Sequence, residues 1–265
     1  MKTRLTWVDN AKGIGILLVV LGHTYGIPVQ LHHIIYSFHM PLFYLLSGYT
    51  FRADSAAERI RTDGLKHSLL KLARAYLVPY FLLAGLNFCG NLVYEVYCGK
   101  FSFAQQLRYI AGTLYCYANM SWMPMCSPIW FLPSVFLTKA IYTGLFLRLR
   151  PGKQHIAAVF CALLAYGSSL LEIPRLPWNL LPSLFGVFFF HAGTLLNRKN
   201  ILCHIRGNRK WLAALIPAAL LCLPIAAENL VGMNENTYGN LAFFLLTSLL
   251  YSVLVMAVSP NKRGC

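Results

Sequence analysis

The feature that most constrains this chain is a long segment, residues 13–51, that contains no Lys, Arg, Asp or Glu. Apolar helices of this kind are suited to the hydrocarbon core of a bilayer. The whole chain follows the same trend, because 57% of its residues are hydrophobic and only 12% are charged. Its mean hydropathy is +0.56. These values exclude an ordinary soluble domain and predict a multi-span membrane protein.

Charged clusters divide the sequence into apolar segments of the length needed to cross a core about 30 Å thick. We therefore predict an all-α fold, a polytopic bundle of about eight transmembrane helices forming one domain over residues 1–265. The predicted spans are 9–27, 34–52, 76–95, 129–147, 156–171, 180–197, 211–228 and 240–258. The fifth is short for a span. Segment 105–120 is expected in an outside loop or at the membrane interface.

The distribution of basic residues predicts the orientation. Most of the 23 Lys and Arg fall in the N-terminal segment, in alternate loops and in the C-terminal tail. Because basic loops stay on the cytoplasmic side, both termini are expected in the cytoplasm. The net charge of +15 builds no contiguous basic face, so the expected partner is the lipid bilayer and not nucleic acid. The basic N-terminus precedes a retained first span, since no small-residue cleavage site follows the apolar run.

The eight cysteines show neither a CxxC motif nor a metal-ligand spacing. Inside apolar spans a cysteine acts mainly as a small hydrophobic residue. Cys98, Cys116 and Cys126 fall in one predicted outside loop, so a disulfide between two of them stays open.

His23 is the strongest candidate for chemistry. An ionisable side chain inside a membrane helix is a functional-site hypothesis by default. It follows Lys12 by eleven residues, which is about three helical turns, so the two share a face roughly 16 Å apart along the axis. An imidazole can accept a proton from a hydroxyl and return it to a leaving group. A structural histidine bonded to a neighbouring helix explains the position equally well.

The second predicted span carries another histidine, His39, followed by Met40 and Pro41. The proline disrupts the helix near the level that His23 reaches, so His39 and Ser47 are candidates for an acceptor cavity. A purely structural kink at Pro41 is the alternative. We expect no metal, because no carboxylate or nearby cysteine could complete a site with the two histidines.

Basic residues near the ends of the first three spans could form a phosphate-binding mouth. Lys12, Arg52, Lys71 and Arg74 are the best placed, and their side chains suit phosphate oxygens. The alternative is that they only set the topology. Trp130, at the start of the fourth span, is either an interface aromatic or a platform for a substrate ring. No GxSxG motif is present.

Four segments carry a family resemblance: DNAKGIGILLVVLGH, IYSFHMPLFYLLSGYTF, KLARAYLVPYFL and SPIWFLPSVFL. Together they resemble the membrane-bound acyltransferase-3 family, and within it the branch of fucose 4-O-acetylase and related acetyltransferases. Lys12 matches the basic position of the family motif, where many members have Arg, and His23 matches the catalytic histidine. Because Arg binds phosphate bidentately and Lys does not, the donor contact is expected to differ in detail.

The resemblance implies an O-acyltransferase of the cell membrane, in a bacterium the cytoplasmic membrane. It would move an acyl group, usually acetyl from acetyl-CoA, to a hydroxyl of an exopolysaccharide, another envelope glycan or a lipid-linked sugar. The co-substrate is acyl-CoA, and no bound cofactor is expected. Many members continue through further helices, so a chain of this length could be inactive or need a partner.

Under this interpretation Lys12 and other basic residues hold the CoA phosphates while the pantetheine arm reaches towards His23. Two alternatives stay open. One is a transporter or flippase that uses the lone histidine as a proton relay. The other is a degenerate family member with a structural role.

Overall fold

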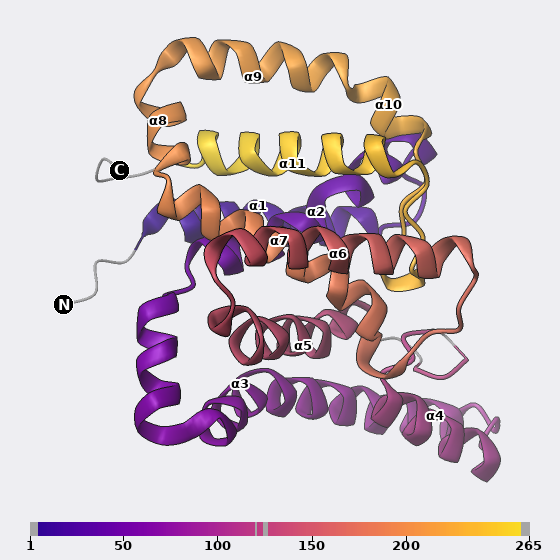
Figure 1. The fold of residues 1–265 in the computed structure, drawn as a ribbon. Coiled ribbons are helices and arrows are strands. Elements are labelled where there is room, and N and C mark those ends of the chain that lie inside the picture. The colour runs from indigo at the N-terminus through magenta and orange to yellow at the C-terminus, as the bar shows by residue number, and fades with distance from the viewer. Residues whose placement is uncertain (1–4, 120, 124–126, 261–265) are drawn as a thin grey trace. The chain divides into compact units, whose positions relative to one another are not determined.

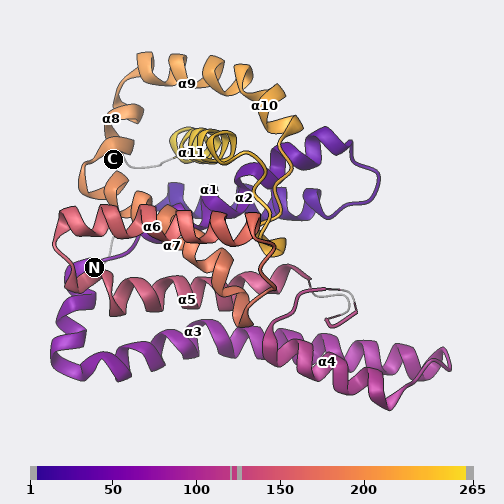
Figure 2. The same ribbon diagram turned by 45° about the vertical axis from the view of Figure 1, so that its right-hand side comes forward.

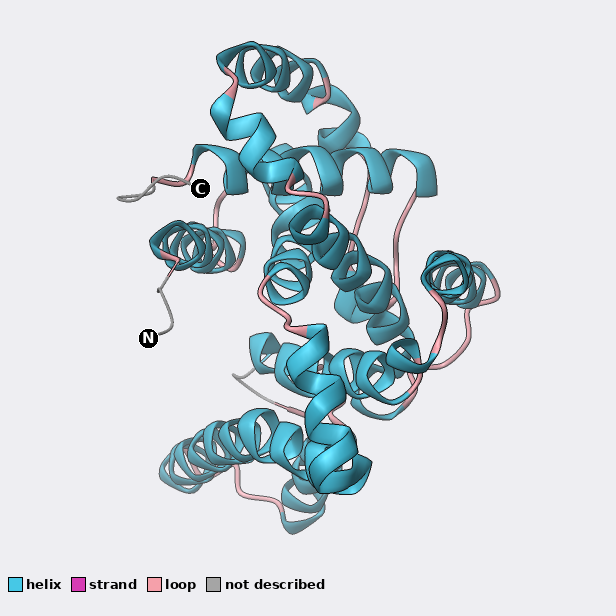
Figure 3. Cartoon of the chain, turned by 60° about the vertical axis from the view of Figure 1, so that its left-hand side comes forward, coloured by secondary structure: helices cyan, strands magenta, loops and turns pink. Residues whose placement is uncertain are grey.

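The structure is a computed structural model that describes residues 5–119, 121–123 and 127–260. These residues form α-helices, short 3-10 helices and connecting turns, and helices dominate the part of the chain that is described (Figure 3). The chain divides into two compact units, Met1–Phe51 with Phe188–Cys265 as unit 1 and Arg52–Val187 as unit 2. The all-α prediction is confirmed.

Among the described residues, four helices are long and apolar enough to cross a membrane: Ala53–Tyr97, Pro128–Arg148, Pro177–Arg198 and Leu241–Val258. The protein is therefore a multi-pass membrane protein. The eight-span arrangement and the cytoplasmic location of both termini stay predictions, as does the single domain.

Unit 1 is built around α2 (Val29–Tyr49). Helix α11 (Leu241–Val258) packs against α2 on one side and against α9 (Arg209–Leu221) on the other (Figure 1). The helices α1 (Thr6–Gly22) and α10 (Leu223–Glu228) also contact α2, and α8 (Ile201–Gly207) contacts α9 and α11. A buried apolar cluster holds α2, α9, α10 and α11 together. Its members are Phe38, Ala219, Ala226 and Tyr251.

Two glycines let α2 approach the C-terminal half of α7 (Leu180–Arg198) closely. A Cβ atom at Gly48 would overlap the carbonyl oxygen of Phe190, and one at Gly193 would overlap that of Leu45. Small residues at such crossings are typical of membrane helices, because they allow backbone-to-backbone packing.

Unit 2 is built on α3 (Ala53–Tyr97), which bends at Gly64, where φ is 82°. Helix α4 (Phe103–Tyr115) folds back beside the C-terminal end of α3 (Figure 2). Helix α5 (Phe131–Gly144), preceded by the 3-10 helix η1 (Ser127–Trp130), packs along α3. Inside this pair, the Lys139 ammonium donates to the hydroxyl of Tyr76 at 2.7 Å.

The remaining elements of unit 2 are η2 (Phe146–Arg148), α6 (Pro151–Leu170) and η3 (Pro177–Asn179). In unit 1, η4 (Met233–Glu235) lies between α10 and α11. Each of the eight predicted apolar segments overlaps helix, but 129–147 is divided among η1, α5 and η2, and 211–228 is divided between α9 and α10. Residues 105–115 of the segment expected outside the membrane lie in α4. The first helix is shorter than expected, because it ends at Gly22 and not near residue 27.

The three cysteines of the predicted outside loop differ in environment. Cys98 is exposed and Cys116 is buried, and both carry free thiols. Burial raises the pKa of the Cys116 thiol to about 11. Cys126 lies outside the described residues, so a disulfide that involves it stays open.

Candidate functional site

His23 is the residue immediately after α1, and its backbone N–H still donates to the last turn of the helix. The helix cannot continue much further, because Gly26 has a φ of 83° and Pro28 precedes α2. The imidazole is exposed. Its Nδ1 lies 2.8 Å from the carbonyl oxygen of Val19. Since a carbonyl only accepts hydrogen bonds, Nδ1 carries the hydrogen in the neutral ring and Nε2 presents a lone pair.

Tyr36 of α2 faces that lone pair. Its hydroxyl lies 3.4 Å from Nε2 of His23. The ring of His32 stacks on the Tyr36 ring with centroids 3.9 Å apart, and the ring of His39 lies 4.9 Å away on the same helix. Residues 32, 36 and 39 follow helical spacing, so they share one face of α2. The site is thus a row of imidazole and phenol rings that ends at the exposed His23.

Gly22 makes this contact between α1 and α2 feasible. A Cβ atom at position 22 would lie 3.0 Å from the ring atom Cε2 of Tyr36 and 3.3 Å from a side-chain carbon of Ile35. A larger residue would push the tyrosine away from the end of α1. Gly22 therefore allows the close packing of α1 against Tyr36.

Lys12 lies on α1 with His23 and is exposed. The 17 residues of α1 give a helix about 25 Å long, and His23 follows directly at its end. Lys12 and His23 are thus held on one rigid element, separated by most of its length.

Two other predicted residues of unit 1, His39 and Ser47, are less exposed than His23. His39 is buried, with 3% of its surface exposed, and its Nδ1 lies 2.8 Å from the carbonyl oxygen of Ile35. Ser47 is half-buried near the C-terminal end of α2. The structure therefore brings His23 and His39 to the same tyrosine and leaves Ser47 elsewhere on the helix.

The four remaining predicted residues belong to unit 2. Arg52, Lys71 and Arg74 are exposed on or beside α3, while Trp130 is buried at the end of η1. The ring of Trp130 packs edge-on against Phe131 with centroids 5.9 Å apart. This burial favours a structural role for the tryptophan over stacking on a substrate.

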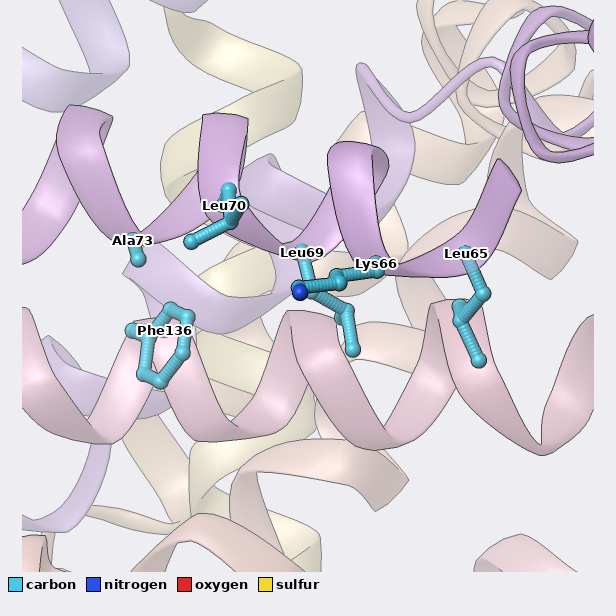
Figure 4. Close-up of a pocket in the computed structure, with 6 residues that line it drawn as sticks. All are labelled: Leu65, Lys66, Leu69, Leu70, Ala73 and Phe136. Carbon is cyan, nitrogen blue, oxygen red and sulfur yellow. The ribbon is translucent and has the colours of Figure 1, made fainter. Parts of the chain in front are cut away.

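Unit 2 also holds an apolar groove of about 390 Å³ between α3 and α5. Figure 4 shows the Lys66 side chain lying along this groove with its nitrogen beside Leu69. Its lining residues are Leu65, Lys66, Leu69, Leu70, Ala73 and Phe136. Five of these six residues belong to α3, the helix that also carries Lys71 and Arg74.

The comparison with protein families decides the identification. A family model described as an acyltransferase domain matches residues 5–264, which is nearly the whole chain. This chain belongs to the acyltransferase-3 family. Neither the curated proteins nor the solved structures gave a match. Membership indicates acyl transfer, in general to a carbohydrate acceptor, so the protein is a membrane acyltransferase. The fucose 4-O-acetylase branch stays a prediction.

In this acyltransferase, the end of α1 brings the exposed imidazole of His23 within 3.4 Å of the Tyr36 hydroxyl. Tyr36 and Gly22 were not predicted from the sequence as part of the site. A signal for Tyr36 was present, because it shares helical spacing with His32 and His39. The groove lined by Lys66 was missed as well, although its residues on α3 follow helical spacing. Among the described residues, no group of three or more His, Cys, Asp and Glu is arranged to hold a metal ion.

Proposed function

We propose that this acyltransferase moves an acyl group, with acetyl as the first candidate, from acyl-CoA to a hydroxyl of an envelope glycan or lipid-linked sugar. His23 acts as the general base. The observation that carries this proposal is the exposed His23 ring, whose Nδ1 lies 2.8 Å from the Val19 carbonyl oxygen, so that Nε2 presents the lone pair. Orientation of an imidazole through its other nitrogen is how general-base histidines are kept in the productive tautomer.

The reaction begins when the acceptor hydroxyl donates to Nε2 of His23. The imidazole takes the proton while the hydroxyl oxygen attacks the thioester carbonyl carbon. The tetrahedral intermediate collapses, the C–S bond breaks, and the imidazolium returns the proton to the CoA thiolate. The products are the O-acyl ester and free CoA.

Cationic side chains hold the charged end of the donor in this proposal. Lys12 lies roughly 16 Å from His23 along the helix axis, a separation that suits a donor carrying its phosphates at one end and its thioester at the other. Lys71 and Arg74, exposed on α3, are proposed as further phosphate contacts, and Arg52 as another. Arg and Lys bind phosphate oxygens through charge-assisted hydrogen bonds.

The test of the base is His23→Ala in purified membranes supplied with labelled acetyl-CoA. Loss of a general base lowers rates by about 10²- to 10⁴-fold, so CoA release and label transfer should fall by at least about 10²-fold. His204→Ala is the matched control, since His204 is also exposed in unit 1. A His23→Ala variant that inserts normally and keeps its activity would overturn the proposal.

The contact with the acyl-CoA donor is tested by two single variants, Lys71→Gln and Arg74→Gln. We expect the KM for acetyl-CoA to rise about tenfold with little change in kcat, because uniform binding is lost. Arg61→Gln is the control, since the Arg61 guanidinium pairs with the Glu58 carboxylate at 2.8 Å. An unchanged KM would remove these two residues from the donor site. Mass spectrometry of envelope polysaccharide with and without the gene would then name the acceptor.

A further inference from the structure

We propose that Tyr36 is a second catalytic residue, whose phenolic hydroxyl donates a hydrogen bond to the thioester carbonyl oxygen as that oxygen becomes negative. This inference rests on the proposed function of His23 as the base. The hydroxyl of Tyr36 lies 3.4 Å from Nε2 of His23. That is longer than the usual O–H donor distance of about 2.8 Å, so the contact is a weak bond that can change partner.

The separation of the two atoms suits a reacting carbonyl group. Acyl transfer needs a place about 3 Å from both the base and an oxyanion donor. Two atoms 3.4 Å apart leave such a place beside them, on the exposed edge of the imidazole. A substrate hydroxyl can then donate to Nε2 while Tyr36 turns its O–H to the carbonyl oxygen of the donor.

Three donors close to the His23 ring already have partners within α1. The backbone N–H of His23 donates to the carbonyls of Val19 and Val20, and the N–H of Thr24 donates to Leu21. The hydroxyl of Thr24 donates to the Val20 carbonyl at 3.0 Å. Backbone N–H groups are common oxyanion donors, and those of His23 and Thr24 are committed to closing the helix. The phenol of Tyr36 is the donor that faces Nε2.

The ring of Tyr36 is held in place independently of its hydroxyl. His32 stacks on it at 3.9 Å, His39 lies at 4.9 Å, and Gly22 leaves room for its edge. Preorganised donors of this kind stabilise a developing charge without reorganising during the reaction. A phenylalanine would keep the ring contacts and remove only the donor.

In the completed step, the acceptor O–H gives its proton to Nε2 and the acceptor oxygen bonds to the thioester carbon. The carbonyl π electrons move to the oxygen, which accepts the hydrogen bond from Tyr36. When the electrons return, the C–S bond breaks and the sulfur leaves with the electron pair. The imidazolium protonates it, and Tyr36 ends the cycle with its own proton.

The experiment compares Tyr36→Phe with Tyr25→Phe in detergent-solubilised full-length protein. Tyr25 is 99% exposed and serves as the matched control. Loss of one oxyanion donor costs about 10²- to 10³-fold in kcat. We expect a loss of that size for Tyr36→Phe with an unchanged KM for acetyl-CoA, and no loss for Tyr25→Phe.

A second donor substrate separates catalysis from structure. The fluorine of fluoroacetyl-CoA stabilises the oxyanion by itself, so Tyr36→Phe should lose less activity with it than with acetyl-CoA. The ratio of the two rates is measured within one preparation, so the folded fraction cancels.

Equal losses with both donors, or full activity of Tyr36→Phe, would overturn the role of Tyr36 while His23→Ala remains inactive. An active His23→Ala variant would instead overturn the proposed function itself.

Discussion

The two units differ in how their polar groups are satisfied. In unit 1, His23 is exposed and, within the described part of the chain, its Nε2 has one hydrogen-bonding contact, with the Tyr36 hydroxyl at 3.4 Å. In unit 2, both carboxylate oxygens of Glu95 accept hydrogen bonds, one from Asn91 at 3.1 Å and Tyr109 at 3.0 Å, the other from Gln106 at 2.5 Å. An acceptor with few hydrogen bonds, such as Nε2 of His23, can accept a proton from a substrate. An acceptor that already receives several hydrogen bonds, such as the Glu95 carboxylate, holds helices together.

The number of hydrogen bonds already made separates a candidate catalytic residue from a structural one, which residue type alone does not. Glutamate and histidine are both frequent catalytic residues. Glu95 ties the end of α3 to α4, because its partners Gln106 and Tyr109 come from α4. Burial, together with the hydrogen bond to Glu95, raises the pKa of the Tyr109 phenol. The following experiments test the packing and the polar contacts of the two units.

The largest effect is expected from Gly48→Ala, which adds a Cβ atom against the Phe190 carbonyl. Overpacking costs about 1–3 kcal/mol, and here the neighbour is backbone that cannot move aside, so the upper end applies. Thermal unfolding in detergent measures it. Gly13→Ala is the control, because a Cβ atom there meets nothing within 4 Å. Equal stabilities of the two variants would contradict the close approach of α2 and α7.

Gly22→Ala should leave the fold intact and lower the activity by displacing the Tyr36 ring. Its Cβ atom lies 3.0 Å from the Tyr36 ring, so the ring must shift by a few tenths of an ångström. Small displacements of catalytic groups are costly, and we expect kcat to fall about tenfold with KM unchanged. Steady-state kinetics with acetyl-CoA check this. An unchanged kcat would mean that the spacing of α1 and α2 does not matter for the reaction.

Glu95→Gln should lower the stability of the fold and leave the activity unchanged. The amide replaces a charged acceptor with a weaker one and adds an N–H₂ group facing existing donors. A net loss of about 1 kcal/mol in the free energy of unfolding is expected, with kcat per folded molecule unchanged. If activity falls while the fold persists, Glu95 belongs to the site and the contrast between the units fails.

The smallest effect concerns the reactivity of two cysteines of unit 2. Burial raises the pKa of Cys116 to about 11, so its thiol stays protonated, and therefore a poor nucleophile, until the pH approaches that value. Maleimide at neutral pH should label the exposed Cys98 first and Cys116 slowly, with the Cys116 rate rising with pH. Mass mapping of labelled peptides measures this. Equally fast labelling of both would show that the end of α4 opens readily.

Much of the helical pattern could be predicted, because a long apolar segment of the chain by itself indicates a helix in the membrane. The predicted spans 34–52, 180–197 and 240–258 correspond to α2, α7 and α11 within a few residues at most ends. The end of α1 could not be placed, since apolar residues continue past Gly22 and the left-handed φ of Gly26 is a matter of backbone geometry. Family motifs pointed to Lys12 and His23 without showing how either is oriented.

The sequence by itself determined the membrane class, the helices and the acyltransferase family, because hydropathy and motif spacing are local properties. Only the tertiary structure decided that the Tyr36 hydroxyl lies beside His23 and that Gly22 leaves room for the Tyr36 ring. It also decided that both carboxylate oxygens of Glu95 accept hydrogen bonds. Those contacts join residues on different helices, and they depend on how two helices cross, which no single segment of the chain specifies.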